Sequence, residues 1–225
     1  MFGIKPKLIG ICGGSSSGKT QISKLLVKHF TDVTQMSMDN YFIVKPDYGG
    51  KTRQEYLMTH NFDSPESFNV ELFVKHLRLL CAGKMIEMPI YDFENSIYIG
   101  TKTIHPREYI LVDGILLNAI PAVREQLYVS IFVNCHNEIR KSRRLKRDVN
   151  ERGADFETVR HQYEMFVEPM YDIYIEPARI YSDIEFDNSE SCNERYLIYK
   201  VSELYSKLNR KINERNILSG EVDMC

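Results

Sequence analysis

The eight residues from Gly13 to Thr20, G-G-S-S-S-G-K-T, have the types and spacing that bind phosphate. They fit the pattern G-x-x-x-x-G-K-[ST], in which glycines let the backbone turn tightly and bring its N–H groups close to an anion. The lysine adds a flexible cation suited to β- and γ-phosphates, and the final hydroxyl stands where Mg²⁺ would bind. The motif predicts a phosphate-binding loop made of Gly13, Gly14, Ser15, Ser16, Ser17, Gly18, Lys19 and Thr20.

The flanking segments support this interpretation. Residues 8–12 form an apolar run typical of a buried strand, and apolar residues follow the loop at helical spacing, from Ile22 to Phe30. A glycine loop between a strand and a helix N-terminus is an anion site, because unpaired N–H groups and the helix dipole point the same way. The alternative, a plain connecting loop, explains neither Lys19 nor Thr20.

Three aspartates are candidates for the chemistry around this loop. Asp113 ends the apolar run 109–113, where a buried strand delivers one carboxylate to the magnesium shell opposite Thr20. Asp39 follows the alternating segment 33–38, and its position alone suits a turn or cap as well as a catalytic group. Asp63, just before Ser64-Pro65, either forms a turn or offers its carboxylate to a ligand hydroxyl.

A run of basic residues occupies 138–153, and on a helix Arg140, Arg144 and Arg147 share one face. Such a run is usually a solvated face. In a chain with a phosphate loop, the alternative is a lid whose arginines close over the transferred phosphoryl group, with Arg152 at the turn of the lid.

Tyr91 and Phe93 are two residues apart, so both would face one side of a strand. The spacing alone favours a hydrophobic strand face over a stacking wall for a flat ligand.

These elements predict an α/β fold in one domain, residues 1–225, with a mostly parallel sheet flanked by helices. We expect a mobile loop over 43–58, a helix that Asn69 caps, a β-ribbon over about 85–106 and helices over about 138–165, which would form a lid in the second interpretation of the basic run. We expect a helix from about Asp155 to Val167, and we expect Pro169 and Pro177 to break the segment that follows it. A capping box at 191–194 opens the last helix, and a frayed tail follows from about 213 to 225.

Composition limits the class of protein. The chain has 225 residues, 43% of them hydrophobic, and a net charge of −2, so nothing global indicates a nucleic-acid or membrane partner. Its five cysteines are scattered and form no C-x-x-C pair. The residues before the loop are too few for a signal sequence, and no apolar run approaches the ~20 residues of a membrane span, so we expect a cytoplasmic protein.

With these pieces in order, the chain resembles the uridine–cytidine kinase family of nucleoside kinases. Five segments carry the resemblance: the phosphate loop, N-F-D-S-P at 61–65, P-I-Y-D-F at 89–93, D-G-I-L-L at 113–117, and R-R-L-K-R-D-V-N-E-R-G at 143–153 followed by H-Q-Y at 161–163. The resemblance implies a P-loop kinase fold with a β-ribbon over the nucleoside and an arginine-bearing lid. It also implies ATP as phosphate donor, Mg²⁺ as cofactor, and assembly as a homo-tetramer.

The resemblance assigns roles to the undecided residues. Asp39 would accept the proton of the ribose 5′-hydroxyl and approach the metal, and Asp63 would hold the ribose hydroxyls. The remaining nucleoside positions would be Phe62, Tyr91, Phe93, Arg144 and Gln162. Lys19, Arg147 and Arg152 would act on the phosphates, and Thr20 and Asp113 on the metal.

Three positions depart from the family pattern. Ser96 stands where the family has a histidine that reaches the pyrimidine, Ala154 where it has an arginine, and 187–189 where P-R-G lies near the donor base. The predicted function is ATP-dependent phosphorylation of a ribonucleoside 5′-hydroxyl, uridine or cytidine first. The rivals are a kinase of the same fold acting on another metabolite, such as nicotinamide riboside or a ribulose phosphate, and a catalytically silent nucleotide-binding module.

Overall fold

The computed structural model describes residues 5–45, 48, 50–190 and 193–219. A five-stranded sheet with all neighbours parallel forms its centre. In spatial order its strands are β2 (Val33–Ser37), β5 (Tyr109–Asp113), β1 (Lys7–Cys12), β6 (Val129–Asn134) and β7 (Ile184–Asp187). The predicted mostly parallel α/β fold is confirmed.

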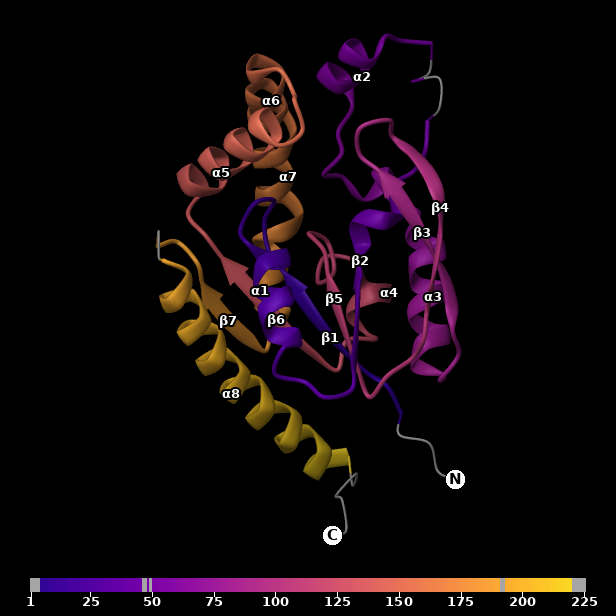
Figure 1. The fold of residues 1–225 in the computed structure, drawn as a ribbon, viewed down its shortest axis with the longest axis vertical. Coiled ribbons are helices and arrows are strands. Elements are labelled where there is room, and N and C mark those ends of the chain that lie inside the picture. Colours follow the sequence, from indigo (N-terminus) through magenta and orange to yellow (C-terminus); the bar gives the residue numbers. More distant parts are fainter. Residues whose placement is uncertain (1–4, 46–47, 49, 191–192, 220–225) are drawn as a thin grey trace.

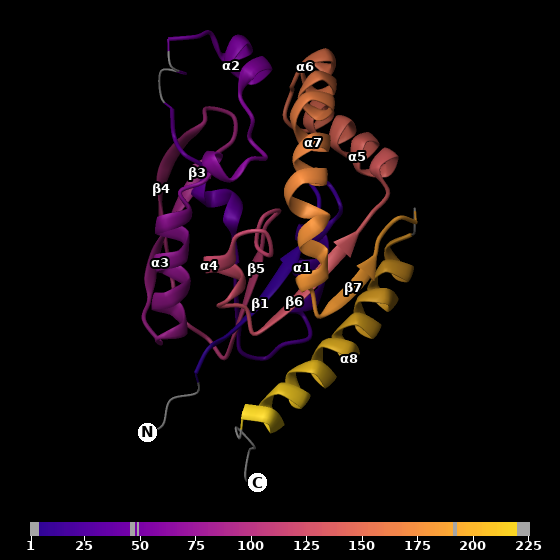
Figure 2. The same ribbon diagram turned by 180° about the vertical axis from the view of Figure 1, so that it is seen from behind.

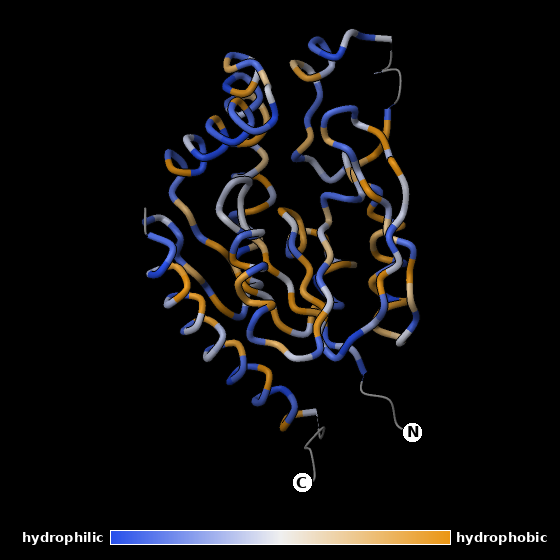
Figure 3. Tube along the Cα trace, viewed as in Figure 1, coloured by the Kyte–Doolittle hydropathy of each residue, from blue (hydrophilic) through white to orange (hydrophobic). Residues whose placement is uncertain are grey.

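Helices cover both faces of the sheet (Figures 1 and 2). On one face lie α1 (Lys19–Val27) and α8 (Glu194–Ser219), and on the other lie α3 (Val70–Cys81) and α4 (Pro121–Arg124). Successive residues of β1 alternate between the two hydrophobic cores, with Leu8 on the α3 side and Ile9 on the α1 side. A strand that is buried on both faces needs a continuous apolar run, which is what residues 8–12 supply. Figure 3 agrees with this: the central strands are coloured mainly as hydrophobic, whereas α5 and α6 are coloured mainly as hydrophilic.

The antiparallel ribbon of β3 (Ile86–Asp92) and β4 (Ile97–Ile104) stands beside the sheet, where the sequence predicted it. Its register shifts between Ile90 and Tyr91, which marks a β-bulge. The helix α2 (Arg53–Thr59) lies beyond it and falls within the segment predicted as a mobile loop, so that prediction is wrong for 53–58. A capping box between Thr52 and Glu55 opens α2.

The basic run forms α5 (Asn137–Asn150), and after a turn the chain enters α6 (Phe156–Gln162), with Asp155 as N-cap. The expected break at Pro169 and Pro177 is wrong, because the chain stays helical through α7 (Glu168–Met170) up to Tyr181. π-helical turns at 163–167 and 171–175 shift the hydrogen-bond register on either side of Pro169.

The expected tail is wrong for residues 213–219, which continue α8. Ile212 is 2% exposed, and Arg215 pairs with Asp183 at 2.6 Å, so distant contacts hold the end of this helix. The remainder of the predicted tail and the first half of the predicted capping box lie outside the described residues. Among the described residues no helix is both long and apolar enough to cross a membrane.

Candidate active site

The phosphate-binding loop leaves the carboxyl end of β1 and enters α1 at Lys19. Gly13 has φ +136°, and a Cβ there would lie 2.4 Å from the Val133 carbonyl oxygen. Gly18 has φ +102°, and its Cβ would lie 2.4 Å from Asn188 Nδ2. Both positions therefore require glycine for backbone conformation and for space.

The loop carries polar groups suited to phosphate oxygens. Among the described residues, two buried loop atoms, Ser16 Oγ and Ser17 Oγ, have no hydrogen-bond partner, and neither has Arg140 Nη1, which reaches the loop at Gly14 from α5. Lys19 Nζ, which is buried, donates to the Gly14 carbonyl oxygen at 2.7 Å. Burial lowers the pKa of Lys19, and the nearby carboxylates of Asp39 and Asp113 oppose that shift. Unpartnered donors at a helix N-terminus fit the phosphates of a nucleotide.

Thr20 and Asp113 form the predicted magnesium pair, with Thr20 Oγ1 donating to Asp113 Oδ2 at 2.8 Å. Burial raises the pKa of Asp113, the charge of Asp39 raises it further, and the Thr20 hydrogen bond opposes the rise. No group of three or more His, Cys, Asp or Glu able to hold a metal occurs in the described part of the chain. A hydroxyl and one or two carboxylates fit Mg²⁺, which keeps several waters and takes the remaining oxygens from substrate phosphates.

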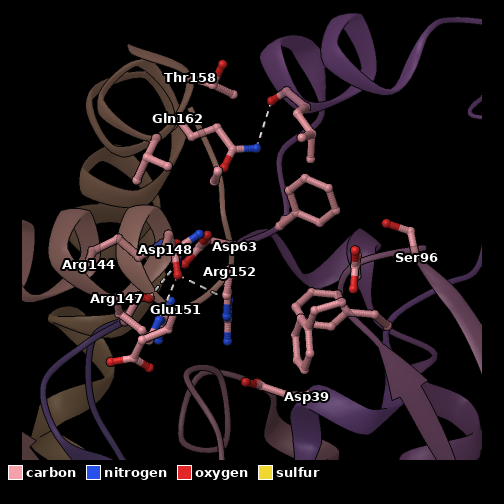
Figure 4. Close-up of a pocket in the computed structure, with 18 of the residues that line it drawn as sticks. Asp39, Asp63, Ser96, Arg144, Arg147, Asp148, Glu151, Arg152, Thr158 and Gln162 are labelled. Carbon is pink, nitrogen blue, oxygen red and sulfur yellow. Dashed lines mark hydrogen bonds and ion pairs between the residues drawn. The ribbon is translucent and has the colours of Figure 1, made fainter. Parts of the chain in front are cut away.

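Next to the loop lies a cavity of about 490 Å³ between the lid helices and the ribbon (Figure 4). The figure shows lid residues such as Arg144 and Gln162 on one side and Asp39 and Ser96 on the other. Residues far apart in the sequence meet here. The predicted residues that line the cavity are Ser15, Asp39, Phe62, Asp63, Tyr91, Phe93, Arg144, Arg147, Arg152 and Gln162.

Asp63 and Arg144 form the charged interior of the cavity. Asp63 is 4% exposed; burial raises its pKa, and the Arg144 charge is the main opposing influence. Arg144 also donates from Nη1 to Ser15 Oγ at 2.7 Å, so it bridges the phosphate loop and the cavity. Asp63 lies in a turn, as one of the two sequence interpretations expected, but its carboxylate is buried beside a cation, a setting that also suits ligand hydroxyls.

Aromatic rings form one wall, with Phe42 at its centre. The Phe42 ring lies 5.3 Å from Tyr91, 6.0 Å from Phe93 and 6.2 Å from Phe62, centroid to centroid. Tyr91 and Phe93 meet edge to face at 5.2 Å. The strand-face prediction is incomplete, because both rings also line the cavity. Phe42 itself escaped the sequence analysis, although it directly follows Asp39-Asn40-Tyr41.

The lid arginines converge on Asp148, a buried residue of α5 that the sequence analysis missed. Its carboxylate pairs with Arg144, Arg147 and Arg152. Arg152 also lies over the Phe93 ring, with its guanidinium carbon 4.8 Å from the centroid. The sequence held a signal: Asp148 stands four residues after Arg144 and four before Arg152, the spacing of neighbours on a helix face.

Ser96, Ala154 and Gln162 also line the cavity. Ser96 is buried, with φ +56°, and its side chain hydrogen-bonds Tyr91, which partly offsets the rise that burial causes in the pKa of Tyr91. Gln162 Nε2 donates to the Leu57 carbonyl oxygen at 2.7 Å, which fixes the nitrogen end of the amide toward α2.

A phosphate loop and a carboxylate-ended strand at one edge of a parallel sheet, together with arginines above them, define a P-loop kinase. The model of the phosphoribulokinase / uridine kinase family matches residues 8–193, and the chain belongs to this family. It is thus a kinase, and the family uses ATP as its donor.

Named relatives agree with this assignment. The chain is 40% identical to a uridine kinase of Leuconostoc citreum over 188 residues, which cover 81% of this chain and 88% of that protein. It is 38% identical to a uridine kinase of Ligilactobacillus salivarius over 183 residues, covering 80% and 84%.

Solved structures share the fold. A putative fructose transport system kinase from Silicibacter sp. TM1040 has a TM-score of 0.66 at 18% identity, covering 82% of this chain and 91% of that one. A possible uridine kinase from Bacillus stearothermophilus has a TM-score of 0.53 at 19% identity, covering 83% and 91%.

Proposed function

We propose that the protein transfers the γ-phosphoryl group of ATP to the 5′-hydroxyl of a ribonucleoside, uridine or cytidine. The observation that carries this proposal is a single cavity that joins Asp39, Asp63, an aromatic wall and the lid arginines beside the phosphate loop. The two uridine kinases at 38% and 40% identity support the same substrate class.

Phosphoryl transfer demands positioning and charge stabilisation more than covalent chemistry from a protein. Lys19 and the loop N–H groups hold the β- and γ-phosphates of ATP. Asp39 orients the 5′-hydroxyl and accepts its proton, while Arg147 and Arg152 neutralise charge on the equatorial oxygens of the transferred group. Thr20 and Asp113, with Asp39 nearby, would hold Mg²⁺, which would supply positive charge to the phosphates of ATP.

Asp63 accepts hydrogen bonds from the ribose 2′- and 3′-hydroxyls, and the charge of Arg144 opposes the rise that burial causes in the pKa of Asp63. Phe62, Tyr91 and Phe93 supply flat apolar surface for the base.

The identity of the acceptor atom is tested with uridine and 5′-deoxyuridine, which lacks the reacting oxygen. We expect UMP and ADP in equal amounts from uridine, and no ADP above background from 5′-deoxyuridine, which should instead inhibit competitively. Phosphate on the 2′ or 3′ oxygen, or ADP release with 5′-deoxyuridine, would contradict the proposal.

Base selection is proposed to be weak, because Ser96 is engaged by Tyr91 and Ala154 has no polar group. Stacking on Tyr91 and Phe93 tolerates any base, since every base has a π-face. The double variant Ser96→His with Ala154→Arg should lower KM for uridine and cytidine and leave adenosine unchanged. The control is Thr101→His, on the exposed part of β4. An equal change for all three nucleosides would show that these positions do not read the base.

A further inference from the structure

Asp148 makes contacts that no assigned role explains. Its side chain is 7% exposed and receives three guanidinium groups. Oδ2 lies 2.5 Å from Arg144 Nε, while Oδ1 lies 2.7 Å from Arg147 Nε and 3.3 Å from Arg152 Nη1. One carboxylate thus serves as the common partner of Arg147 and Arg152, which are assigned to the phosphoryl group, and of Arg144, which reaches the phosphate loop.

The charges explain why such a partner is needed. Burial lowers the pKa of Arg152, and the neighbouring charges of Arg147 and Arg144 lower it further, whereas Asp148 raises it. For Asp148, burial alone would raise the pKa, but the surrounding arginines outweigh this and the pKa is lowered. The carboxylate therefore stays ionised and offsets the repulsion that would drive the arginines apart.

The geometry also sets orientation. Arg144 and Arg147 each meet Asp148 through Nε, the inner edge of the guanidinium group. Because the guanidinium group is planar with donors in a rigid fork, fixing Nε fixes the direction of the two terminal amino groups. Arg144 shows the result, since its Nη1 donates to Ser15 Oγ in the phosphate loop at 2.7 Å. Arg147 makes its contact among the described residues through Nε, which leaves its terminal groups available to a phosphate.

We propose that Asp148 is a positioning residue for phosphoryl transfer: it holds the guanidinium groups of Arg144, Arg147 and Arg152 together, aims the terminal donors of Arg147 at the phosphoryl group, and aims a terminal donor of Arg144 at the phosphate loop. The inference rests on the roles given to Arg147 and Arg152 in the proposed function. It predicts that Asp148 acts on the chemical step through the arginines, without touching either substrate.

The test compares Asp148→Asn with Asp155→Asn. Asp155 belongs to the same lid, but its side chain caps α6 by accepting from the Thr158 N–H, a task that asparagine also performs. Steady-state ADP release should show kcat about 10- to 100-fold lower for Asp148→Asn and unchanged for Asp155→Asn. The Kd for ATP, measured without acceptor, should change less than about threefold, because the arginines act mainly on charge that develops in the transition state.

A double-mutant cycle separates positioning from general damage. Asp148→Asn is made both in the unmodified protein and in an Arg147→Ala variant. Because Asp148 acts partly through Arg147, the fall in log kcat in the Arg147→Ala variant should be at most about half the fall in the unmodified protein. Asp148→Glu keeps the charge and should recover part of kcat. If Asp148→Asn does not fold, Asp148→Glu is compared with Asp155→Glu instead. A kcat for Asp148→Glu several-fold below that for Asp155→Glu then supports the inference.

A kcat for Asp148→Asn within twofold of the unmodified protein, or full additivity with Arg147→Ala, overturns the inference. If the unmodified protein phosphorylates no nucleoside, the proposed function fails on its own. The same variants are then compared by their slow hydrolysis of ATP, where loss with Asp148→Asn supports this inference and equal rates overturn it.

Discussion

Thr20 Oγ1 and Asp113 Oδ2 lie 2.8 Å apart, although 93 positions separate the two residues in the chain. Thr20 stands at the start of α1, and Asp113 ends β5, which pairs with β1 so that Asp113 lies beside Ile11. This register carries the carboxylate to the edge of the sheet from which the phosphate loop leaves. Folding itself therefore assembles the two protein ligands that we propose for Mg²⁺.

The buried Asp113 carboxylate should lower the free energy of unfolding of the protein when neither Mg²⁺ nor ATP is bound. Its pKa in the folded protein is raised above the ordinary value of 3.8, mainly by burial. Between that value and the folded pKa the folded state binds more protons than the unfolded state, so stability falls as pH rises through this window. Asp113→Asn should therefore raise Tm at pH 7, by about 2–4 °C for each 1 kcal/mol relieved.

The measurement is a pair of thermal unfolding curves for the two proteins at pH 7 and at pH 5, without metal or nucleotide. The Tm of Asp113→Asn should exceed that of the unmodified protein by less at the lower pH, where Asp113 is closer to gaining its proton. Added MgATP should stabilise the unmodified protein more than the variant. A lower Tm for Asp113→Asn at pH 7, or an advantage that grows as pH falls, would contradict this account.

Lys19→Ala should lower kcat about 100-fold or more, because the ammonium group stabilises charge that grows as the γ-phosphoryl group leaves. Circular dichroism should show an intact fold. Lys24→Ala, in the last turn of the same helix, is the matched control and should keep full activity. Near-normal turnover in a folded Lys19→Ala protein would contradict the assignment of residues 13–20 as the loop that binds the donor phosphates.

Asp39→Asn keeps the shape of the side chain and removes the proton acceptor. We expect kcat to fall about 100-fold or more while the Kd for ATP stays within about threefold, as measured by titration with a fluorescent ATP analogue. Retained turnover together with lost magnesium affinity would assign Asp39 to the metal alone.

A 2′-deoxynucleoside should be a poor substrate, because part of the buried Asp63 carboxylate then lacks a partner. Leaving such a group unpaired costs about 1–3 kcal/mol, so kcat/KM for deoxyuridine should be about 5- to 150-fold below that for uridine. The difference should disappear in Asp63→Asn. Equal kcat/KM for the two nucleosides in the unmodified protein would remove Asp63 from the ribose site.

Local signals predicted the parts of the fold that local physics determines. The phosphate loop and the strand before Asp113 depend on glycine positions and continuous apolar runs, both visible in the sequence. The Thr52–Glu55 capping box of α2 was equally visible, but the surrounding glycines and polar residues favoured a loop.

Other features depend on contacts between distant residues, which spacing alone does not reveal. The helix persists past Pro169 because π-helical turns adjust its register and Tyr163 packs and hydrogen-bonds onto Asn137. The end of α8 is held by the pairing of Arg215 with Asp183. Asp148 was overlooked because acids within a basic run are usual on a solvated face. Its spacing of four from Arg144 and Arg152 was a signal, but its burial beside three guanidinium groups is visible in the structure alone.

The central claim, that the cavity accepts a ribonucleoside, is tested most directly by coupled measurement of ADP release over a substrate panel. The panel contains uridine, cytidine, adenosine, nicotinamide riboside and ribulose 5-phosphate, each with ATP and Mg²⁺. We predict ADP release with the nucleosides, highest kcat/KM for uridine and cytidine, measurable use of adenosine because base contacts are few, and no release with ribulose 5-phosphate. ADP release with ribulose 5-phosphate alone, or with no compound of the panel, would contradict the account.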